Sequence, residues 1–278
     1  MIPDAQVEQL HHERIDEFLR SVAKAPLSVL LLDYDGTLAP FVLNRNQAIP
    51  YEGLTDLLQR IVNAGRTRLV IVTGRDAHDI GTLLGLKPNL EVWGAHGLQR
   101  LRPDGVCEMR KLPANVKRAL DDARRWLRYQ GLQHLAEIKP GSVAVHWRGI
   151  EDVAAKLLRG RVLLGWSRIA EHASLKLLEF DGGVEMRLAG LDKGDVVRTI
   201  VKEAGPGVPI AYLGDDAADE HAFEVLGPIG LTALVRPTPR RTSAQIWLKA
   251  PQELLEFLAR VLAATEPAPR ARSKVHSQ

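Results

Sequence analysis

The 278-residue sequence predicts an α/β fold in which a doubly wound parallel sheet is interrupted by a smaller, inserted α+β domain. Two observations predict this fold. In the first and last thirds of the chain, runs of consecutive apolar residues alternate with amphipathic helical stretches, and continuous hydrophobicity is typical of strands buried on both faces. In the middle third, helices alternate with pairs of strands joined by turn residues, as in antiparallel hairpins.

Five apolar runs are predicted to be the buried strands of the core, and each one but the last ends in polar residues. They are "SVLLLDYDG" at 28–36, "RLVIVTGR" at 68–75, "LEVWGAHG" at 90–97, "PIAYLGDD" at 209–216 and "GLTALV" at 230–235. Helices are predicted between and after these strands, at 54–64, 76–84, 193–204, 217–226 and 251–263. An amphipathic helix is predicted within residues 1–24, with one apolar face formed by Val7, Leu10, Phe18 and Leu19.

The middle of the chain breaks this rhythm. Helices are predicted at 113–130 and 150–164, and each is followed by two strands, which span 134–148 around "KPGS" and 174–188 around "DGG". The sequence therefore predicts a core formed by residues 1–109 and 189–265 and an inserted domain formed by residues 110–188. Residues 266–278 are rich in proline and polar residues, and we expect them to be disordered.

The composition narrows the classes of function. The formal net charge is only +3, and no cluster of lysine and arginine with interleaved aromatic residues appears, so nucleic acid is not an expected partner. No apolar run approaches the roughly 20 residues of a membrane span. Cys107 is the single cysteine, which excludes an intrachain disulfide. The N-terminal residues lack the basic and apolar segments of a signal peptide, so the sequence predicts a cytoplasmic protein.

Polar residues at the strand ends are expected to form one site, because ligands bind at the carboxyl ends of the strands in open α/β sheets. Several carboxylates in one cleft would repel one another strongly unless a cation lies between them. Oxygen ligands of this kind suit Mg²⁺, and a metal and a lysine around an aspartate are typical of phosphoryl transfer. The residues concerned are Asp33, Asp35, Thr73, Gly74, Arg75, His96, Lys193, Asp215, Asp216 and Asp219.

Four segments resemble, in order, the motifs of the haloacid dehalogenase-like (HAD) phosphohydrolases: "DYDGT" at 33–37, "VTGR" at 72–75, "DKG" at 192–194 and "GDDAADE" at 214–220. The resemblance implies that Asp33 is the nucleophile and that Asp35 is the general acid and base. It also implies phosphate binding by Thr73 and Lys193, and a Mg²⁺ site formed by Asp33, Asp35 and Asp215.

Four further residues have supporting roles in this interpretation. Asp216 and Asp219 would support the metal site. Gly36 would allow a tight turn after the paired acids, and Thr37 would offer a hydroxyl and a backbone N–H near the phosphate. The place of the insert between the second and third motifs resembles the C2 cap of the HAD superfamily, which closes over the leaving group.

Two hairpins of the insert carry a narrower resemblance. Strict alternation in "KPGSVAVHWRG" (139–149) and "DGGVEMRL" (181–188) predicts one apolar face and one polar face. Together with "GAHG" (94–97), these segments resemble the trehalose-6-phosphate phosphatases. The resemblance implies that the sugar is bound by Lys139, His146 and Glu185, with Arg148 and Arg187 nearby and His96 at the boundary between core and cap.

The resemblance implies Mg²⁺-dependent hydrolysis of a sugar phosphate, with trehalose 6-phosphate as the first candidate, through an aspartyl-phosphate intermediate. Alternatives remain open: a phosphatase for sucrose phosphate or mannosyl-phosphoglycerate, a phosphomutase, and a non-catalytic sensor or regulatory partner of a trehalose-phosphate synthase. At the level of single residues, Arg75 also suits an ion pair, and His96 also suits a structural role.

Overall fold

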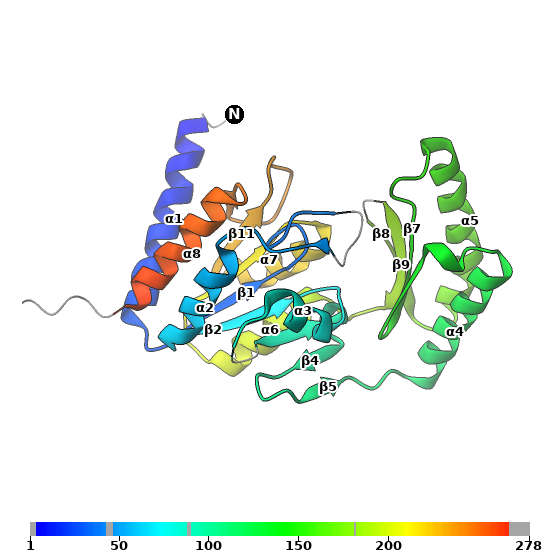
Figure 1. Ribbon diagram of the computed structural model, residues 1–278, viewed down its shortest axis with the longest axis horizontal. Helices are drawn as coiled ribbons and strands as arrows, with labels where there is room; N and C mark the ends of the chain where they lie inside the picture. The colour runs from blue at the N-terminus through cyan, green and yellow to red at the C-terminus, as the bar shows by residue number, and fades with distance from the viewer. Residues whose placement is uncertain (1–3, 43–46, 88–89, 181, 267–278) are drawn as a thin grey trace, which may run out of the picture.

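The computed structural model describes residues 4–42, 47–87, 90–180 and 182–266. The larger of its two sheets has eight strands (Figure 1). Neighbouring strands are parallel from β12 to β3, whereas β4 is antiparallel to β3 and β5 is antiparallel to β4. In order across the sheet, the strands are β12 (Ile246–Leu248), β11 (Leu231–Val235), β10 (Ile210–Gly214), β1 (Ser28–Leu32), β2 (Thr67–Val72), β3 (Glu91–Gly94), β4 (Gln99–Leu101) and β5 (Cys107–Met109).

Helices cover both faces of this sheet, as the continuous apolar runs predict. In the central strand β1, Leu30 and Leu32 belong to one hydrophobic cluster, and Val29 and Leu31 belong to another on the opposite face. The first cluster packs under α1 (Asp4–Lys24), α2 (Leu54–Ala64), α3 (Ala77–Leu84) and α8 (Gln252–Thr265), and the second packs under α6 (Lys193–Ala204) and α7 (Glu220–Leu226). Both faces of the strands are therefore apolar, which confirms the doubly wound core.

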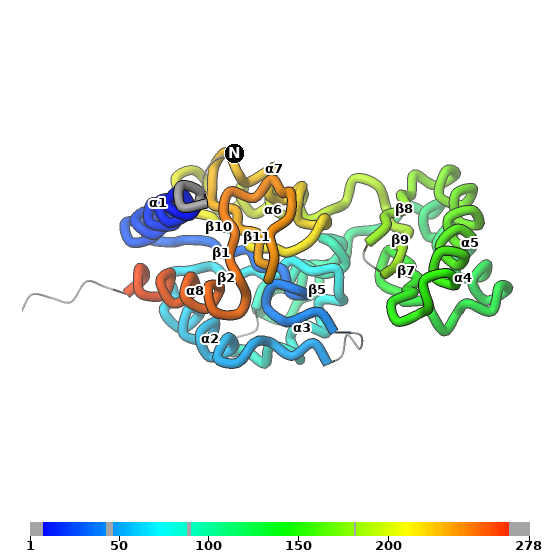
Figure 2. The backbone as a smooth tube through the Cα atoms, turned by 90° about the horizontal axis from the view of Figure 1, so that it is seen from above, coloured from blue at the N-terminus to red at the C-terminus, as the bar shows by residue number. Residues whose placement is uncertain are grey.

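The second sheet is antiparallel and has four strands, with two long helices on one face (Figures 1 and 2). Its strand order is β6 (Ala136–Lys139), β7 (Ser142–His146), β9 (Gly183–Leu188) and β8 (Leu175–Phe180), and its helices are α4 (Ala114–Tyr129) and α5 (Asp152–Glu171). Val143, Val145, Val184 and Met186 pack against these helices in a separate hydrophobic cluster. The predicted alternation is confirmed, and the polar face of the sheet points away from α4 and α5, toward the core.

Several predicted boundaries were right, and others were wrong. The helices at 54–64 and 193–204 begin and end at the predicted residues. The helix predicted at 150–164 instead runs from Asp152 to Glu171, because Trp166 and Ala170 continue its buried face. The stretch at 217–226 is a short 3₁₀ turn (η4, Ala217–Asp219) followed by α7. Strands β4, β5 and β12 were not predicted, since each has only three residues.

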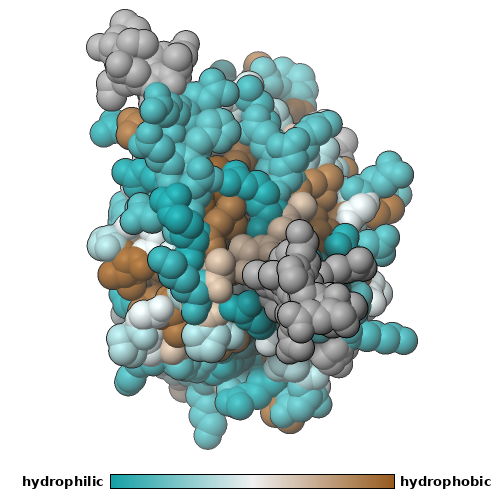
Figure 3. All heavy atoms as spheres, turned by 90° about the vertical axis from the view of Figure 1, so that its left-hand side faces the viewer, coloured by the Kyte–Doolittle hydropathy of each residue, from teal (hydrophilic) through white to brown (hydrophobic). Residues whose placement is uncertain are grey.

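The N-terminal helix packs on α8 through a face that includes Phe18 and Leu19, as predicted, together with Ile15 and Val22. Ile15, Phe18 and Val22 are buried, whereas the side chain of Leu10 is half exposed, at 49%. The side chain of Val7 lies outside the described part of the structure. Figure 3 views this end of the molecule, and hydrophilic side chains cover most of it, with apolar atoms visible between them.

Two further predictions concern the ends and divisions of the chain. Apart from Glu266, the tail predicted to be disordered (266–278) lies outside the described residues. The domain boundaries at 109/110 and 188/189 stay predictions. Within the described ranges, no helix has both the length and the apolar character that crossing a bilayer would need.

Candidate active site

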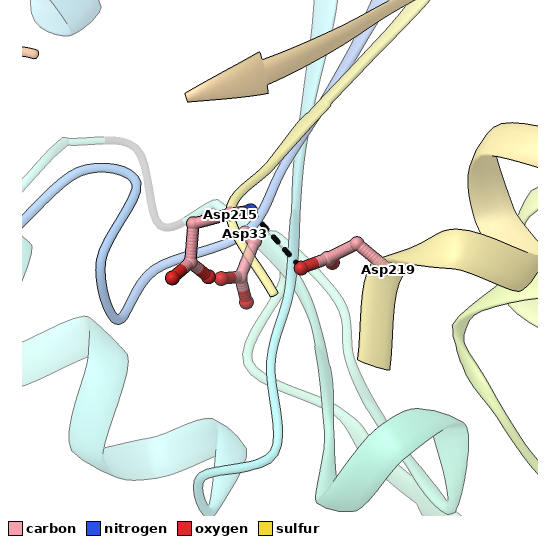
Figure 4. Close-up of side chains that lie close together, drawn as sticks. All are labelled: Asp33, Asp215 and Asp219. Atoms are coloured by element: carbon pink, nitrogen blue, oxygen red, sulfur yellow. Dashed lines mark hydrogen bonds between the residues drawn. The ribbon is translucent and has the colours of Figure 1, made fainter. Parts of the chain in front are cut away.

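Three aspartates meet at the carboxyl ends of the central strands (Figure 4). Asp33 follows β1, Asp215 follows β10, and Asp219 ends the 3₁₀ turn η4. One oxygen from each carboxylate lies within 4.8 Å of the others, and all three residues are buried. Because β1 and β10 are parallel neighbours, their ends place Asp33 and Asp215 side by side although 182 residues separate them in the sequence.

Lys193 supplies a positive charge to this cluster. It is the first residue of α6, and Asp192 caps that helix by accepting hydrogen bonds from the backbone N–H groups of Gly194 and Asp195. The capped helix start directs the ammonium group inward. Its Nζ donates to Oδ1 of Asp33 at 2.6 Å and to Oδ1 of Asp219 at 2.7 Å.

Asp219 is fully occupied by hydrogen bonds. Besides Lys193, the hydroxyl of Tyr212 donates to its Oδ1 at 2.6 Å. The backbone N–H groups of Asp215 and Asp216 donate to its Oδ2 at 3.1 and 3.0 Å, and Figure 4 draws the first of these bonds. With both oxygens engaged, Asp219 is suited to hold Lys193 and the 215–216 turn in place rather than to bind a ligand directly.

The remaining two carboxylates carry more negative charge than one lysine neutralises. Burial raises the pKa of Asp33 to about 7, although the charge of Lys193 acts in the opposite direction. Burial and the charges of Asp33 and Asp219 raise the pKa of Asp215 well above its usual range. A divalent cation between Asp33 and Asp215 would relieve this repulsion, and the all-oxygen ligand set fits Mg²⁺.

The turn after the first strand packs tightly against these acids. Gly36 has a φ of +83°, and a Cβ there would lie 2.2 Å from Oδ2 of Asp215, so no larger residue fits. Thr37 is buried, and its hydroxyl lies 3.4 Å from Oδ2 of Asp33. Gly36 and Thr37 therefore form one wall of the acidic site, where the sequence led us to expect them.

Asp35 lies apart from the hydrogen bonds that join Asp33, Lys193 and Asp219. Its carboxylate accepts two hydrogen bonds from the guanidinium of Arg75, from Nε at 2.7 Å and from a terminal nitrogen at 2.5 Å. Burial alone would lower the pKa of Arg75, but the hydrogen bonds and charge of Asp35 raise it. Thr73, at the start of the same turn, is buried, and its hydroxyl accepts from the backbone N–H of Arg75 at 3.1 Å.

His96 joins the core to the cap. Its Nε2 lies 3.1 Å from Oε2 of Glu185 on strand β9. The ring also lies on the backbone of Gly74, where a Cβ would come within 2.6 Å of Cε1. Ala95 and His96 both have positive φ values, 47° and 57°, in a left-handed turn that non-glycine residues rarely adopt.

Burial lowers the pKa of His96 to about 4, so the ring is neutral at pH 7. Its Nε2 then donates to the Glu185 carboxylate, which leaves Nδ1 as an acceptor. That nitrogen is buried without a hydrogen-bond partner among the described residues. An unpaired acceptor at the boundary between core and cap suits a ligand that carries hydroxyl groups.

The polar face of the cap sheet concentrates further charge around Glu185. Oε1 of Glu185 accepts from Nζ of Lys139 at 3.1 Å and from the hydroxyl of Ser142 at 2.7 Å. Burial alone would raise the pKa of Glu185, but Lys139 and these hydrogen bonds, together with that of His96, hold it well below its usual range. Arg187 is on the same face, and burial lowers its pKa.

Two other predicted cap residues have separate partners. Nε2 of His146 lies 2.8 Å from Oε2 of Glu137, and the His146 ring lies 5.3 Å from the ring of Phe180. The guanidinium carbon of Arg148 lies 5.6 Å from the ring centre of Phe41, which is in the 36–42 turn outside the cap. The cap therefore contacts the core through Glu185 with His96 and through Arg148 with Phe41, and Gly141 also lies beside Leu98.

Sequence reasoning missed four residues of this region. Glu137 could have been found by extending the alternating pattern one strand earlier, because Glu137 and Lys139 share the polar face. Ser142 was assigned to that face but given no role. Phe41 and Tyr212 carry no sequence signal, since only the folded chain places the first beside Gly36 and the second beside Asp219.

Comparisons with known proteins agree with the geometry. The family model described as trehalose-phosphatase matches residues 31–252. The chain is 30% identical over 250 residues to the trehalose-phosphate phosphatase of Mycobacterium marinum; the match covers 85% of this chain and 62% of that protein.

Two solved structures share the fold. One is the C-terminal domain of Candida albicans trehalose-6-phosphate phosphatase, with a TM-score of 0.76 and 20% identity over 90% of this chain and 96% of that chain. The other is a haloacid dehalogenase-like hydrolase from Bacteroides thetaiotaomicron, with a TM-score of 0.61 and 14% identity over 84% and 99%. The family model covers most of the chain and confirms the narrower resemblance, so the chain belongs to the trehalose-phosphatase family.

Proposed function

We propose that this protein is a Mg²⁺-dependent phosphatase that hydrolyses trehalose 6-phosphate to trehalose and phosphate. The observation that carries the proposal is the cluster of Asp33, Lys193 and Asp215 at the mouth of the core sheet. The polar face of the cap sheet carries Lys139 and Glu185, and Glu185 contacts His96 of the core. Reactive acids on one side and hydrogen-bonding groups on the other suit a phosphorylated sugar.

In the first half of the reaction, a carboxylate oxygen of Asp33 attacks phosphorus while the bond from phosphorus to the sugar oxygen breaks. Asp35 gives a proton to that oxygen, so trehalose leaves as the neutral alcohol and Asp33 carries the phosphoryl group. Lys193 and Thr73 bind the phosphoryl oxygens in this proposal.

In the second half, the Asp35 carboxylate takes a proton from water as the water attacks the phosphorus of the aspartyl phosphate. The bond to Asp33 breaks, phosphate is released, and both aspartates return to their starting forms. Asp33, Asp215 and the backbone carbonyl of Asp35 would hold Mg²⁺. The ion, when bound, neutralises phosphate charge in a site that has a net excess of carboxylates.

The decisive experiment measures phosphate release from a panel of sugar phosphates with Mg²⁺ and with EDTA. Trehalose 6-phosphate should be the best substrate, and EDTA should abolish its turnover. Asp33→Asn should remove activity while the circular dichroism melt stays cooperative. A variant that keeps wild-type activity would disprove the aspartyl-phosphate mechanism.

The same panel separates the alternatives. A preference for sucrose phosphate or mannosyl-phosphoglycerate would reassign the sugar and keep the chemistry. A phosphorylated sugar isomer as product, without free phosphate, would indicate a phosphomutase. Binding without turnover would indicate a sensor. Association with a trehalose-phosphate synthase and a cytoplasmic location stay predictions, and co-purification with a synthase would test the first.

A further inference from the structure

The ion pair between Arg75 and Asp35 lies in the site, and the proposed reaction gives Arg75 no role. Two parallel hydrogen bonds, of 2.5 and 2.7 Å, join the guanidinium to both oxygens of the carboxylate. A fork of this kind fixes the direction of a carboxylate as well as its distance, which a single bond or a lysine cannot do.

The surroundings hold Arg75 still. Only 4% of its side chain is exposed, and its guanidinium lies 5.3 Å from the ring centre of Tyr34, the residue between the two acids of the first motif. Its backbone is tied on both sides, because its N–H donates to the Thr73 hydroxyl and its carbonyl accepts from Ala95 at 2.7 Å. Arg75 is therefore a rigid support for Asp35.

This geometry argues against direct substrate binding by Arg75 and favours the ion pair that the sequence left open for it. The two guanidinium nitrogens that could bind a phosphate already donate hydrogen bonds to Asp35. With so little of the side chain exposed, a substrate has almost no guanidinium surface to meet. The two nitrogens that bond Asp35 would have to release it before they could bind a phosphate.

We propose that Arg75 is a positioning residue that holds the Asp35 carboxylate in the orientation from which it takes the proton of the attacking water. This inference rests on the proposed function. Proton donation by Asp35 to the leaving sugar oxygen produces the carboxylate, and the Arg75 fork then holds it for the second half-reaction. Loss of Arg75 should therefore slow hydrolysis of the aspartyl phosphate more than its formation.

The test uses Arg75→Gln, Arg75→Lys, Asp35→Asn and the double variant Arg75→Gln/Asp35→Asn. p-Nitrophenyl phosphate reports formation of the aspartyl phosphate by itself, because its leaving group departs without a proton. Trehalose 6-phosphate reports the full cycle. Intact-mass measurement after an acid quench reports how much enzyme carries a phosphoryl group.

Arg75→Gln should lower kcat on trehalose 6-phosphate by at least about 10²-fold, and KM should fall with it, because kcat/KM reports formation of the aspartyl phosphate and should change much less. A burst of nitrophenolate should precede slow turnover, and phosphoenzyme should accumulate. The double variant should be no slower than Asp35→Asn, because Arg75 acts through Asp35. Arg75→Lys should recover only part of the activity, since a point charge does not reproduce the fork.

Arg68→Gln is the matched control. Arg68 lies on β2, the strand that leads to Arg75, and it makes the same two-bond contact with a carboxylate, that of Glu91, outside the site. The Arg68 variant should lose stability without accumulating phosphoenzyme.

Three results would overturn the inference. A raised KM with unchanged kcat would make Arg75 a substrate ligand. If the rate loss of the double variant equals the product of the two single losses, the two residues act independently. Equal slowing of both half-reactions, with a lowered melting temperature, would make Arg75 merely structural. A wild-type protein that releases no phosphate from any sugar phosphate would instead refute the proposed function. The single and double variants could still be compared with p-nitrophenyl phosphate.

Discussion

Nε2 of His96, in the core, lies 3.1 Å from Oε2 of Glu185, in the cap, and both side chains are largely buried. Glu185 is also bonded by Lys139 and Ser142 on its own sheet. One carboxylate thus connects the strained turn at the core sheet's mouth to the polar face of the cap. The first three predictions follow from this contact.

Glu185→Gln should weaken binding of the sugar and leave the phosphoryl chemistry intact. Hydrogen bonds to a charged group contribute about 1.5–3 kcal/mol, so KM for trehalose 6-phosphate should rise by about tenfold to a hundredfold. Turnover of p-nitrophenyl phosphate, which has no sugar, should change little. Steady-state kinetics on both substrates check this.

Glu179→Gln is the control for Glu185→Gln. Glu179 is on the opposite face of the same sheet and pairs with the exposed Arg159 of α5. Its replacement should change neither KM nor kcat. Equal losses on both substrates in the Glu185 variant would place Glu185 in the chemistry rather than in sugar recognition.

Gly74→Ala should displace His96. A Cβ at position 74 would lie 2.6 and 2.7 Å from Cε1 and Nε2 of the ring, which is closer than any stable contact. The ring would shift away from Glu185, and kcat/KM for trehalose 6-phosphate should fall by about 10-fold to 100-fold.

Gly81→Ala offers a clean comparison for Gly74→Ala. Gly81 is in helix α3, and a Cβ there meets nothing within 4 Å. That variant should keep full activity and gain about 0.5–1 kcal/mol of stability from helix propensity. If both glycine variants keep the same kcat/KM for trehalose 6-phosphate, the contact of Gly74 with His96 does not contribute to catalysis.

His96 should make the stability of the protein fall as the pH is lowered. Burial lowers the pKa of His96 to about 4, whereas the unfolded chain titrates near 6.5. Between these values the unfolded state binds a proton that the folded state does not. The free energy of unfolding therefore decreases from pH 6.5 down to pH 4, by at most roughly 3 kcal/mol from this residue.

Urea unfolding of wild type and of His96→Gln, each at about pH 7.5 and about pH 5, measures this contribution. The free energy of unfolding should differ less between the two pH values in His96→Gln than in the wild type. His172→Gln, at the exposed end of α5, should leave it unchanged. An undiminished pH dependence in His96→Gln would mean that the ring is readily protonated in the folded protein.

Asp219→Asn should damage both stability and catalysis, although Asp219 is not expected to touch the substrate. Its carboxylate accepts four hydrogen bonds, one of them from Lys193, and an amide would turn a donor toward at least one of these donors. We expect a loss of about 2–4 kcal/mol of unfolding free energy. The rate should fall because Lys193 loses one of its two anchors.

Asp216→Asn is the comparison for Asp219→Asn. The side chain of Asp216 caps η4 by accepting from the backbone N–H groups of Ala217 and Asp219, and asparagine keeps an oxygen that can accept these bonds, so the change should cost less than about 1 kcal/mol. Thermal melts and kcat measurements on the two variants would show the contrast. Similar effects in both would mean that the saturated hydrogen bonding of Asp219 does not stabilise the site.

The sequence predicted the core fold because its signals are local. Each buried strand is a continuous apolar run, and each helix at 54–64 and 193–204 has a local apolar stripe or cap that sets its ends. The cap hairpins were predicted from their two-residue period, which survives in any environment. Strands β4, β5 and β12 escaped prediction because three residues are too few to establish a period.

The sequence by itself determined which residues gather at the mouth of the sheet, since the ends of parallel strands must meet at one edge. Only the tertiary structure decided their partners. Lys193 binds Asp33 across 160 residues, and Arg75 turns to Asp35. These choices depend on distances of a few tenths of an ångström, set by the packing of whole helices and strands, and no local pattern in the chain encodes them.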